Sequence, residues 1–266
     1  MSSDVELAER AARAAGEILL AWYGRAPEGL GSKSSATDLV SDADREAERA
    51  IRELLAAERP HDGVLGEEGS RASAESGRRW VVDPLDGTVN FLYGFPVWAV
   101  SVALEDIGGA VVGVVHDPLH GDCFSAVRGE GARLSREPDP GGVDASRAEP
   151  AGRLRASGRR DLARALVATG FSYEPERRAA QAEVVARVLP RVRDIRRAGA
   201  AALDLCAVAA GRVDAFYERG INHWDWAAGR LIVTEAGGVV EDLAGDPHGL
   251  VAAGTPELAT ALTALL

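Results

Sequence analysis

The sequence predicts an α/β fold, in which helices and strands alternate along the chain. Segments with apolar residues at helical spacing alternate with short β-like runs that are bounded by Gly, Pro and Asp. The chain has 266 residues, of which 46% are hydrophobic, so it is long enough to bury one large core or two closely packed ones. Alternation of this kind indicates helices layered on sheets.

The first half of the chain predicts two helices on a sheet. Apolar residues at helical spacing predict a helix over residues 5–23 and a second from Ser41 to just before Pro60. Asp44, three residues after Ser41, completes a pattern that resembles a capping box. Turn residues then separate five short predicted strands, at residues 63–66, 80–82, 97–104, 110–116 and 123–127.

A loop rich in Pro, Gly and Asp, residues 136–150, divides the chain into two halves of one compact unit, 1–140 and 141–266. In the second half, strands are expected at residues 165–169, 194–197, 213–217 and 239–242. Helices are expected at residues 176–189, 201–210 and 225–236. Alanine is abundant in the last two of these helices, which is typical of helix-forming composition.

Composition excludes several classes of function. The net charge of −11 and the isoelectric point near 5.0 argue against binding to nucleic acid or to an anionic membrane, which needs clustered Lys and Arg. A small phosphorylated ligand remains compatible, because bound Mg²⁺ supplies positive charge locally. Cys123 and Cys206 lack the spacing of a zinc site or a disulfide framework. The chain shows no targeting segment and no membrane-spanning run, so we expect a cytoplasmic protein.

The most informative stretch is residues 80–90, where an apolar run delivers Asp83, Asp86, Gly87 and Thr88 onto one tight turn. Two acids three residues apart at a strand end repel each other unless a cation lies between them, and Mg²⁺ takes oxygen ligands. The stretch therefore predicts a site for metal and phosphate. Ordinary turn chemistry of Asp-Pro and Asp-Gly pairs is the alternative, and this stretch alone leaves both open.

Other acids occupy positions from which they could share this site. Glu67 follows a short apolar run, at a strand end where α/β sheets gather ligands, although a solvated loop glutamate is the alternative. Asp225 begins an apolar helix, where it would bind a metal or act as the N-cap. Glu218 leaves a strand shortly before Asp225 and could meet hydroxyl groups of a ligand. Asp44 either caps its helix or orients the Thr88 hydroxyl.

Taken together, these motifs resemble those of the inositol monophosphatase family. The resemblance rests on Gly-Glu-Glu at residues 66–68, Asp-Pro-Leu-Asp-Gly-Thr at 83–88 followed by Asn90-Phe91, Trp224-Asp225 before a small-residue helix, and the segment from Lys33 to Asp44. It covers most of the chain and is closest to bacterial members. The resemblance implies a layered α-β-α-β-α sandwich, a homodimer, and hydrolysis of a phosphate monoester that depends on Mg²⁺ and is inhibited by Li⁺.

The resemblance also implies a set of metal ligands. Glu67, Asp83 and the backbone carbonyl of Leu85 would hold a first Mg²⁺ ion. Asp83, Asp86 and Asp225 would hold a second, and a weaker third ion would lie near Glu67. Most of these ligands belong to the first half of the chain, whereas Asp225, like Glu218, belongs to the second.

Further roles follow from the same resemblance. Thr88, polarised by Asp44, and Glu67 would orient and deprotonate the attacking water. Phosphate oxygens would bind to the backbone N–H groups of Gly87 and Thr88. The other substrate-binding residues would be Gly199, Ala200, Glu218 and Asp225, and Lys33 would belong to a loop that closes over the metals.

The substrate is less well specified than the reaction. Glu218 favours a neutral polyol, and hence inositol-1-phosphate, over a bisphosphate. Histidinol phosphate, fructose-1,6-bisphosphate and phosphoadenosine phosphate are the alternatives, and one of Arg193, Arg196 and Arg197 could reach a second phosphate.

Two other hypotheses are weaker. A phosphatase that forms an aspartyl-phosphate uses acids two residues apart, whereas Asp83 and Asp86 are three apart. A non-catalytic regulatory or RNA-associated protein is the other, because a fold does not fix a function. Against it, every acid that a two-metal site needs is present.

Overall fold

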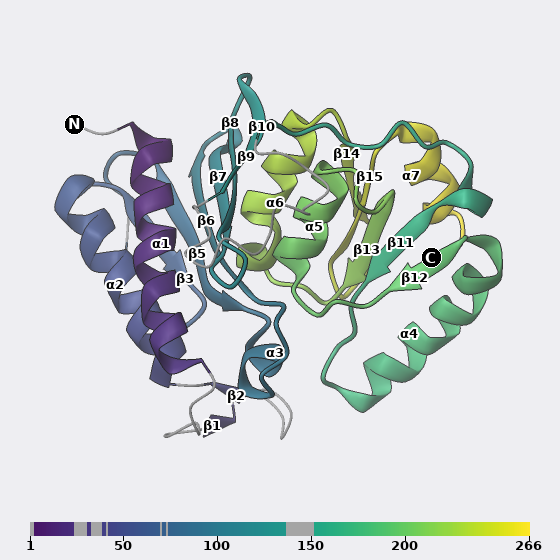
Figure 1. Cartoon of the computed structure of the whole chain (residues 1–266), viewed down its shortest axis with the longest axis horizontal. Helices are drawn as coiled ribbons and strands as arrows, with labels where there is room; N and C mark the ends of the chain where they lie inside the picture. The colour runs from purple at the N-terminus through teal and green to yellow at the C-terminus, as the bar shows by residue number, and fades with distance from the viewer. Residues whose placement is uncertain are drawn as a thin grey trace.

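The computed structural model describes residues 3–23, 31–32, 39–40, 42–69, 71–72, 74–136 and 152–266. Its helices and sheets stack in five layers, in the order α-β-α-β-α from left to right in Figure 1. The predicted α/β class and the layered sandwich are therefore confirmed. Lys33, Ser41 and the boundary between residues 140 and 141 lie outside the described residues, so the expectations that fall on them are not addressed.

The first outer layer consists of α1 (Asp4–Trp22) and α2 (Asp42–Glu58), which pack on the first sheet (Figure 1). Ser3 begins α1 through a capping box: its hydroxyl accepts a bond from Glu6 N, and the Glu6 carboxylate accepts one from Ser3 N at 2.9 Å. The buried face of α2 carries two acids, Asp44 and Glu48, among its apolar residues. Acids are rarely buried on an otherwise apolar helix face, so their presence here suggests a functional role.

The first sheet has the strand order β10-β9-β8-β7-β6-β5-β3-β4. Among the described strands of this sheet, only β3 and β5 pair in parallel, so both carry their carboxyl ends to the same edge. A separate pair is formed by β1 (Gly31–Ser32) and β2 (Leu39–Val40). The strands of the sheet are β3 (Gly63–Gly66), β4 (Arg71–Ala72), β5 (Arg79–Asp86), β6 (Ala99–Asp106), β7 (Gly109–Asp117), β8 (Asp122–Val127), β9 (Gly131–Arg136) and β10 (Gly152–Arg153).

The second sheet has the order β12-β11-β13-β15-β14 and lies on the other side of a helical middle layer (Figure 1). That middle layer consists of α5 (Ala201–Ala209) and α6 (His223–Glu235), while α4 (Pro175–Val188) and α7 (Pro256–Thr263) cover the outer face. The strands are β11 (Leu166–Thr169), β12 (Asp194–Arg196), β13 (Ala215–Arg219), β14 (Val239–Leu243) and β15 (Gly249–Ala253); short 3₁₀ turns span Leu162–Arg164 and Leu189–Arg191.

Close contacts hold the middle layer between the sheets. A Cβ atom on Gly113 of β7 would lie 2.7 Å from the backbone oxygen of Ala228 in α6. One on Gly229 would lie 2.6 Å from the Leu205 side chain in α5. Both distances are shorter than a Cβ contact tolerates, so Gly113 lets the first sheet approach α6, and Gly229 lets α5 and α6 pack closely within the middle layer. The buried apolar residues of α5, α6 and both sheets form one continuous core here.

All the predicted helices and strands that lie within the described residues are present, and their ends agree within two residues with one exception. The strand predicted at 80–82 continues to Asp86, because a break in register between Asp83 and Asp86 accommodates Pro84. The sequence did not predict α3 (Thr88–Leu92), β9, β15, α7 or the two-residue strands β1, β2, β4 and β10. These are short elements, for which periodicity is a weak signal.

Candidate active site

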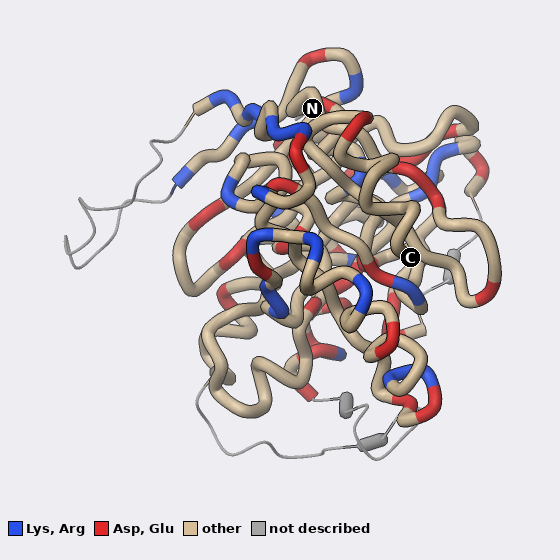
Figure 2. The backbone as a smooth tube through the Cα atoms, turned by 90° about the vertical axis from the view of Figure 1, so that its right-hand side faces the viewer, with Lys and Arg blue, Asp and Glu red and all other residues tan. Residues whose placement is uncertain are grey.

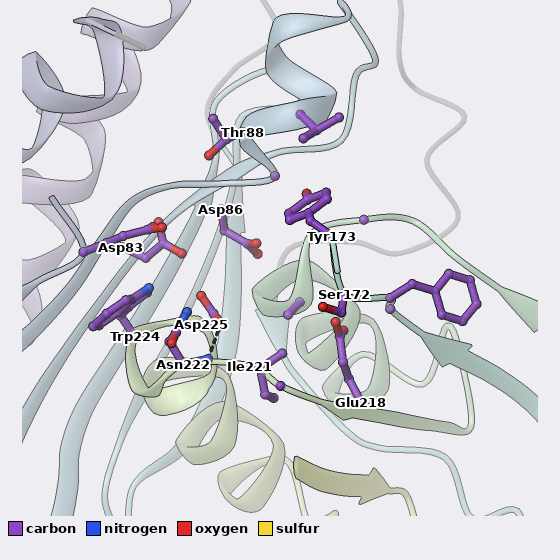
Figure 3. A pocket seen from close by; sticks show the side chains of 18 of the residues that line it. Asp83, Asp86, Thr88, Ser172, Tyr173, Glu218, Ile221, Asn222, Trp224 and Asp225 are labelled. Atoms are coloured by element: carbon purple, nitrogen blue, oxygen red, sulfur yellow. Dashed lines mark hydrogen bonds between the residues drawn. The ribbon is translucent and has the colours of Figure 1, made fainter. Parts of the chain in front are cut away.

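A pocket of about 390 Å³ lies where the carboxyl ends of β3, β5 and β13 meet the starts of α3, α5 and α6 (Figure 3). Both halves of the chain contribute to it. Nine of the residues predicted for the site line it: Glu67, Asp83, Leu85, Asp86, Gly87, Thr88, Gly199, Glu218 and Asp225. Two others, Asp44 and Ala200, do not line it, and both are buried, with 0% and 1% of their surface exposed.

The end of β5 delivers the central acids. Asp83 Oδ1 accepts a hydrogen bond from Leu85 N at 3.0 Å, which fixes the carboxylate beside the turn. Gly87 follows with φ 91°, a left-handed conformation, and a Cβ there would lie 2.9 Å from the Val97 carbonyl. Only glycine fits this position. The chain then turns into α3, and Thr88 Oγ1 donates a hydrogen bond to the Leu85 carbonyl at 3.0 Å.

Glu67 comes from the neighbouring parallel strand. Its backbone N–H donates to the Val82 carbonyl at 3.3 Å, which ties the end of β3 to β5. Glu48 of α2 supports the same turn from behind, since its Oε2 accepts a bond from Glu68 N at 2.7 Å. The Glu48 carboxylate also packs against Gly66, where a Cβ would lie 2.5 Å from it. Glu67 is therefore fixed by contacts on both sides of its backbone.

Asp86 connects the two halves of the molecule. Its Oδ2 accepts a hydrogen bond from Ala202 N at 2.7 Å, across 116 residues of sequence. Ala202 lies in the first turn of α5, where backbone N–H groups have no partner within the helix and favour a negative charge. The Asp86 carboxylate therefore faces the amino end of α5.

Asp225 lies in the first turn of α6, but the alternative that it is the N-cap is wrong. Asn222 is the N-cap, and Asp225 is the third residue of the helix. Its Oδ2 accepts a bond from Asn222 N at 2.6 Å, drawn as a dashed line in Figure 3. This is the acidic partner of a capping box, and it holds the carboxylate on the side of the helix that lines the pocket.

The acids of the pocket oppose one another's ionisation. Burial is the largest cause that raises the pKa of Asp83, and the charges of Glu67, Asp86 and Asp225 add to it. Burial and then Asp225 raise the pKa of Asp86, while the Ala202 N–H bond lowers it. Burial also raises the pKa of Glu218 to about 8. Such a group of carboxyls binds either protons or a cation.

The donor set fits a hard divalent cation. Buried carboxylates and a backbone carbonyl are the ligands that Mg²⁺ uses, and their charges need compensation in this pocket. Within the described residues, no group of three or more His, Cys, Asp or Glu side chains is already arranged to hold a metal. Asp83, Asp86 and Asp225 instead direct an oxygen to backbone N–H groups. The donor chemistry therefore fits, and binding would require the carboxylates to converge.

The far side of the pocket contains residues that sequence reasoning missed. The connection from β11 to α4 contributes Ser172 and Tyr173, α4 contributes Arg177, and Figure 3 shows the Glu218 side chain directed toward Ser172. No motif or spacing marks these residues in the sequence. Of the three arginines considered for a second phosphate, Arg197 lines the pocket, whereas Arg196 pairs with Asp194 at 2.6 Å. Arg193 is exposed and does not line it.

The sequence model of the inositol monophosphatase family matches residues 1–266. The chain belongs to this family. The resemblance inferred from the motifs is therefore confirmed. Mycobacterium leprae has an inositol-1-monophosphatase that is 46% identical over 246 residues, which cover 88% of this chain and 80% of that protein. The crystal structure of the extragenic suppressor protein suhB from Bartonella henselae superposes with a TM-score of 0.87, at 39% identity, and covers 99% of this chain and 98% of that one.

Other members of the family carry a different name. A Nus factor SuhB from Pasteurella multocida is 40% identical over 247 residues, covering 92% of this chain and 87% of that protein. Family membership therefore supports a phosphatase but does not by itself fix the activity. Among the described helices, none is long and apolar enough to cross a membrane. Lys and Arg are interspersed with Asp and Glu along the described chain in Figure 2.

Proposed function

We propose that this member of the inositol monophosphatase family hydrolyses phosphate monoesters with Mg²⁺, and that inositol-1-phosphate is its substrate. One observation carries the proposal. A single pocket combines the acids Glu67, Asp83, Asp86 and Asp225 with a Gly87-Thr88 turn on one side and Glu218 on the other. That arrangement provides a place for metal, for phosphate and for a hydroxyl-bearing leaving group. The name of the Mycobacterium leprae relative supports the substrate.

The metal ligands follow from the donor set. Glu67, Asp83 and the Leu85 carbonyl would hold one Mg²⁺ ion, and Asp83, Asp86 and Asp225 a second, with a third ion near Glu67. When bound, the ions would lower the pKa of the attacking water and neutralise the departing oxygen. Li⁺ would inhibit by competing for these positions. The raised pKa values of Asp83 and Asp86 support the proposal, because a cation relieves the repulsion that causes them.

The protein side chains would orient the water and the phosphate. Thr88 Oγ1 donates its proton to the Leu85 carbonyl, so its lone pairs can accept a hydrogen bond from the water. Glu67 would take the proton of that water as general base. Asp44 is buried and does not line the pocket, and its role in polarising Thr88 stays a prediction. The N–H groups of Gly87 and Thr88 would hold phosphate oxygens.

The leaving group would lie against the second half of the chain. Glu218 and the backbone around Gly199 line that side of the pocket, and burial raises the pKa of Glu218 to about 8 when no metal is bound. A carboxyl group accepts hydrogen bonds whether or not it is ionised, which suits the hydroxyl groups of a polyol. Ala200 does not line the pocket, so the residues on either side of it, Gly199 and Ala201, would contribute there instead.

Phosphate release decides the proposal. We would measure it for inositol-1-phosphate, histidinol phosphate, fructose-1,6-bisphosphate and phosphoadenosine phosphate, with Mg²⁺, without it, and with Li⁺ added. Turnover of inositol-1-phosphate should require Mg²⁺, and Asp86→Asn should lower it at least a hundredfold, because a metal ligand and a charge are lost. Preference for another of these esters would retain the reaction but reject the substrate. No Mg²⁺-dependent release from any of them would reject the proposed reaction on these substrates.

A regulatory role is the second candidate, and the name of the Pasteurella multocida relative supports it. Such a role would operate through a protein partner, because the net charge of −11 disfavours direct binding to nucleic acid. In cells that depend on this protein, an Asp86→Asn variant separates the two candidates. Full biological function without phosphatase activity would favour the regulatory role.

A further inference from the structure

We propose that Asn90 is a positioning residue that fixes the leaving-group wall of the pocket, defined here as residues 198–202. The proposal rests on the proposed function, because it assigns a part of the substrate to that wall. Asn90 lies in α3, has 9% of its surface exposed, and does not line the pocket. Its influence on the reaction must therefore pass through the groups that it holds.

The Asn90 amide uses its donors on two separate segments. Nδ2 donates to the Val97 carbonyl at 2.7 Å and to the Ala198 carbonyl at 2.9 Å, the latter across 108 residues of sequence. Both partners are acceptors, so the site requires two N–H donors on one short side chain. Asparagine satisfies this requirement. An aspartate of the same shape would direct a carboxylate at two carbonyl oxygens, and alanine would leave both carbonyls without this partner.

The other end of the leaving-group wall is held from the same stretch of chain. Asp86 Oδ2 accepts a bond from Ala202 N at 2.7 Å. Asp86 ends β5 and Asn90 lies in α3, four residues later. Residues 86–90 therefore hold the wall at both ends, at the Ala198 carbonyl and at the Ala202 amide.

Gly199, between these two anchors, shows how close the wall lies to its support. It has φ +95° and lines the pocket, and a Cβ there would lie 3.0 Å from Asn90 Nδ2. Little space separates the wall from the Asn90 side chain. Because the wall touches the pocket on one side and Asn90 on the other, loss of the amide frees the wall to move relative to Asp83 and Asp86.

This geometry divides the substrate between two supports. The turn at residues 83–88 would receive the phosphate, while the wall and Glu218 would receive the leaving group. Asn90 sets the separation between them. Its loss should therefore weaken binding of the whole ester and leave the binding of inorganic phosphate unchanged, a distinction that a general loss of stability would not produce.

The test compares Asn90→Ala and Asn90→Asp with Tyr93→Ala, a control at the end of the same short helix whose side chain is 81% exposed. Three quantities are measured at a temperature where all variants are folded. They are KM for inositol-1-phosphate, the inhibition constant of inorganic phosphate, and the hydrogen-exchange rates of the backbone amides of residues 199–202. The exchange rates do not depend on catalytic activity.

For Asn90→Ala we expect KM to rise about tenfold, the change that corresponds to loss of the one hydrogen bond that reaches the wall, at the Ala198 carbonyl, with the phosphate constant within twofold of the wild type. Exchange at residues 199–202 should accelerate by a similar factor, and Asn90→Asp should have at least as large an effect. Three outcomes would each overturn the proposal. They are an unchanged KM with unchanged exchange rates, a rise of KM in proportion to the inhibition constant of phosphate, and an Asn90→Asp variant that behaves as wild type. If the wild type hydrolyses no phosphate ester, the proposed function fails, and exchange alone decides whether Asn90 holds the wall.

Discussion

Glu48 supports the candidate base without reaching the pocket. Glu48 is 4% exposed, and its carboxylate accepts the Glu68 N–H and packs on Gly66, so it fixes the backbone on both sides of Glu67. Within the proposed mechanism Glu67 both binds metal and takes a proton, so a displaced Glu67 should affect metal affinity first. Glu48 therefore extends the site by one residue into α2.

The first prediction concerns this residue. Glu48→Ala should raise the Mg²⁺ concentration needed for half-maximal activity by about tenfold, because it removes a charge-assisted hydrogen bond. Glu48→Gln keeps an acceptor oxygen and should recover most of the loss. Terbium(III) luminescence sensitised by Trp224, which lines the pocket, would report metal binding independently of turnover. Glu53→Ala, on an exposed position of α2, is the control; equal metal requirements in Glu48→Ala and this control would contradict the prediction.

The acids at the ends of strands and helices were predictable from the sequence, because local turn patterns place them. Asp83, Asp86 and Glu67 each follow an apolar run, and all three line the pocket. Ser172 and Tyr173 were not predictable, since the connection from β11 to α4 reaches the pocket only through packing of the second half. Whether each residue has its assigned role stays a prediction.

At the scale of the elements, the fold depends on contacts that leave no room for a side chain. Gly113 in the middle of β7 faces the backbone of Ala228 in α6, and backbone atoms cannot move aside as a flexible side chain can. This contact determines how closely the first sheet approaches α6 in the middle layer. The same helix carries Asp225, whose side chain lines the pocket.

The second prediction tests this contact. Gly113→Ala should lower the free energy of unfolding by about 1–3 kcal/mol, because an added methyl group overpacks a rigid interface. Chemical denaturation monitored by circular dichroism measures the change. Gly158→Ala is a matched control, since nothing lies within 4 Å of a Cβ added there, and it should change stability by less than about 1 kcal/mol. Similar losses in both variants would show that the β7–α6 contact is not responsible.

The elements that the sequence missed have at most eight residues, although several equally short strands were predicted correctly. The helix expected at 5–23 is α1, and the strand expected at 239–242 is β14. β5 was predicted too short, because a proline within a strand normally argues against one. Pro84 is tolerated since the register shifts between Asp83 and Asp86. Asp83 and Asp86 are three residues apart and would face opposite sides of a regular strand, so the irregularity lets both line the pocket, and the error fell at the candidate site.

For the whole molecule, the buried acids make stability depend on pH. Burial raises the pKa of Asp204 to about 7 and that of Glu218 to about 8, from ordinary values of 3.8 and 4.5. At a pH between the ordinary and the raised pKa of each group, the folded protein holds more protons than the unfolded chain. These groups therefore destabilise the fold as pH rises. The loss of unfolding free energy that their ionisation causes is absent below about pH 4 and complete above about pH 8.

The third prediction follows from this sign. In the presence of a chelator, the Tm of Glu218→Gln should rise relative to that of the wild type as the pH is raised from 5 to 8. The gain should be roughly 2–4 °C for each kcal/mol of unfolding free energy that the neutral side chain restores. Added Mg²⁺ should raise the Tm of the wild type more at pH 8 than at pH 5, because protons compete with the metal for the same carboxylates. Differential scanning calorimetry measures both. A difference in Tm between variant and wild type that does not vary with pH would contradict the assignment of Glu218.

Homodimer formation stays a prediction that sedimentation would test.

The five-layer order restricts how this sequence can change over time. An outer helix such as α4 exposes most of its side chains, so many substitutions there meet only water. Every residue of α5 is buried or half-buried, because the helix touches other elements on all sides. Its alanines are therefore needed for their small volume as well as for helix formation. Across lineages that retain the fold, side-chain volume should drift least in α5 and α6, and most in α4.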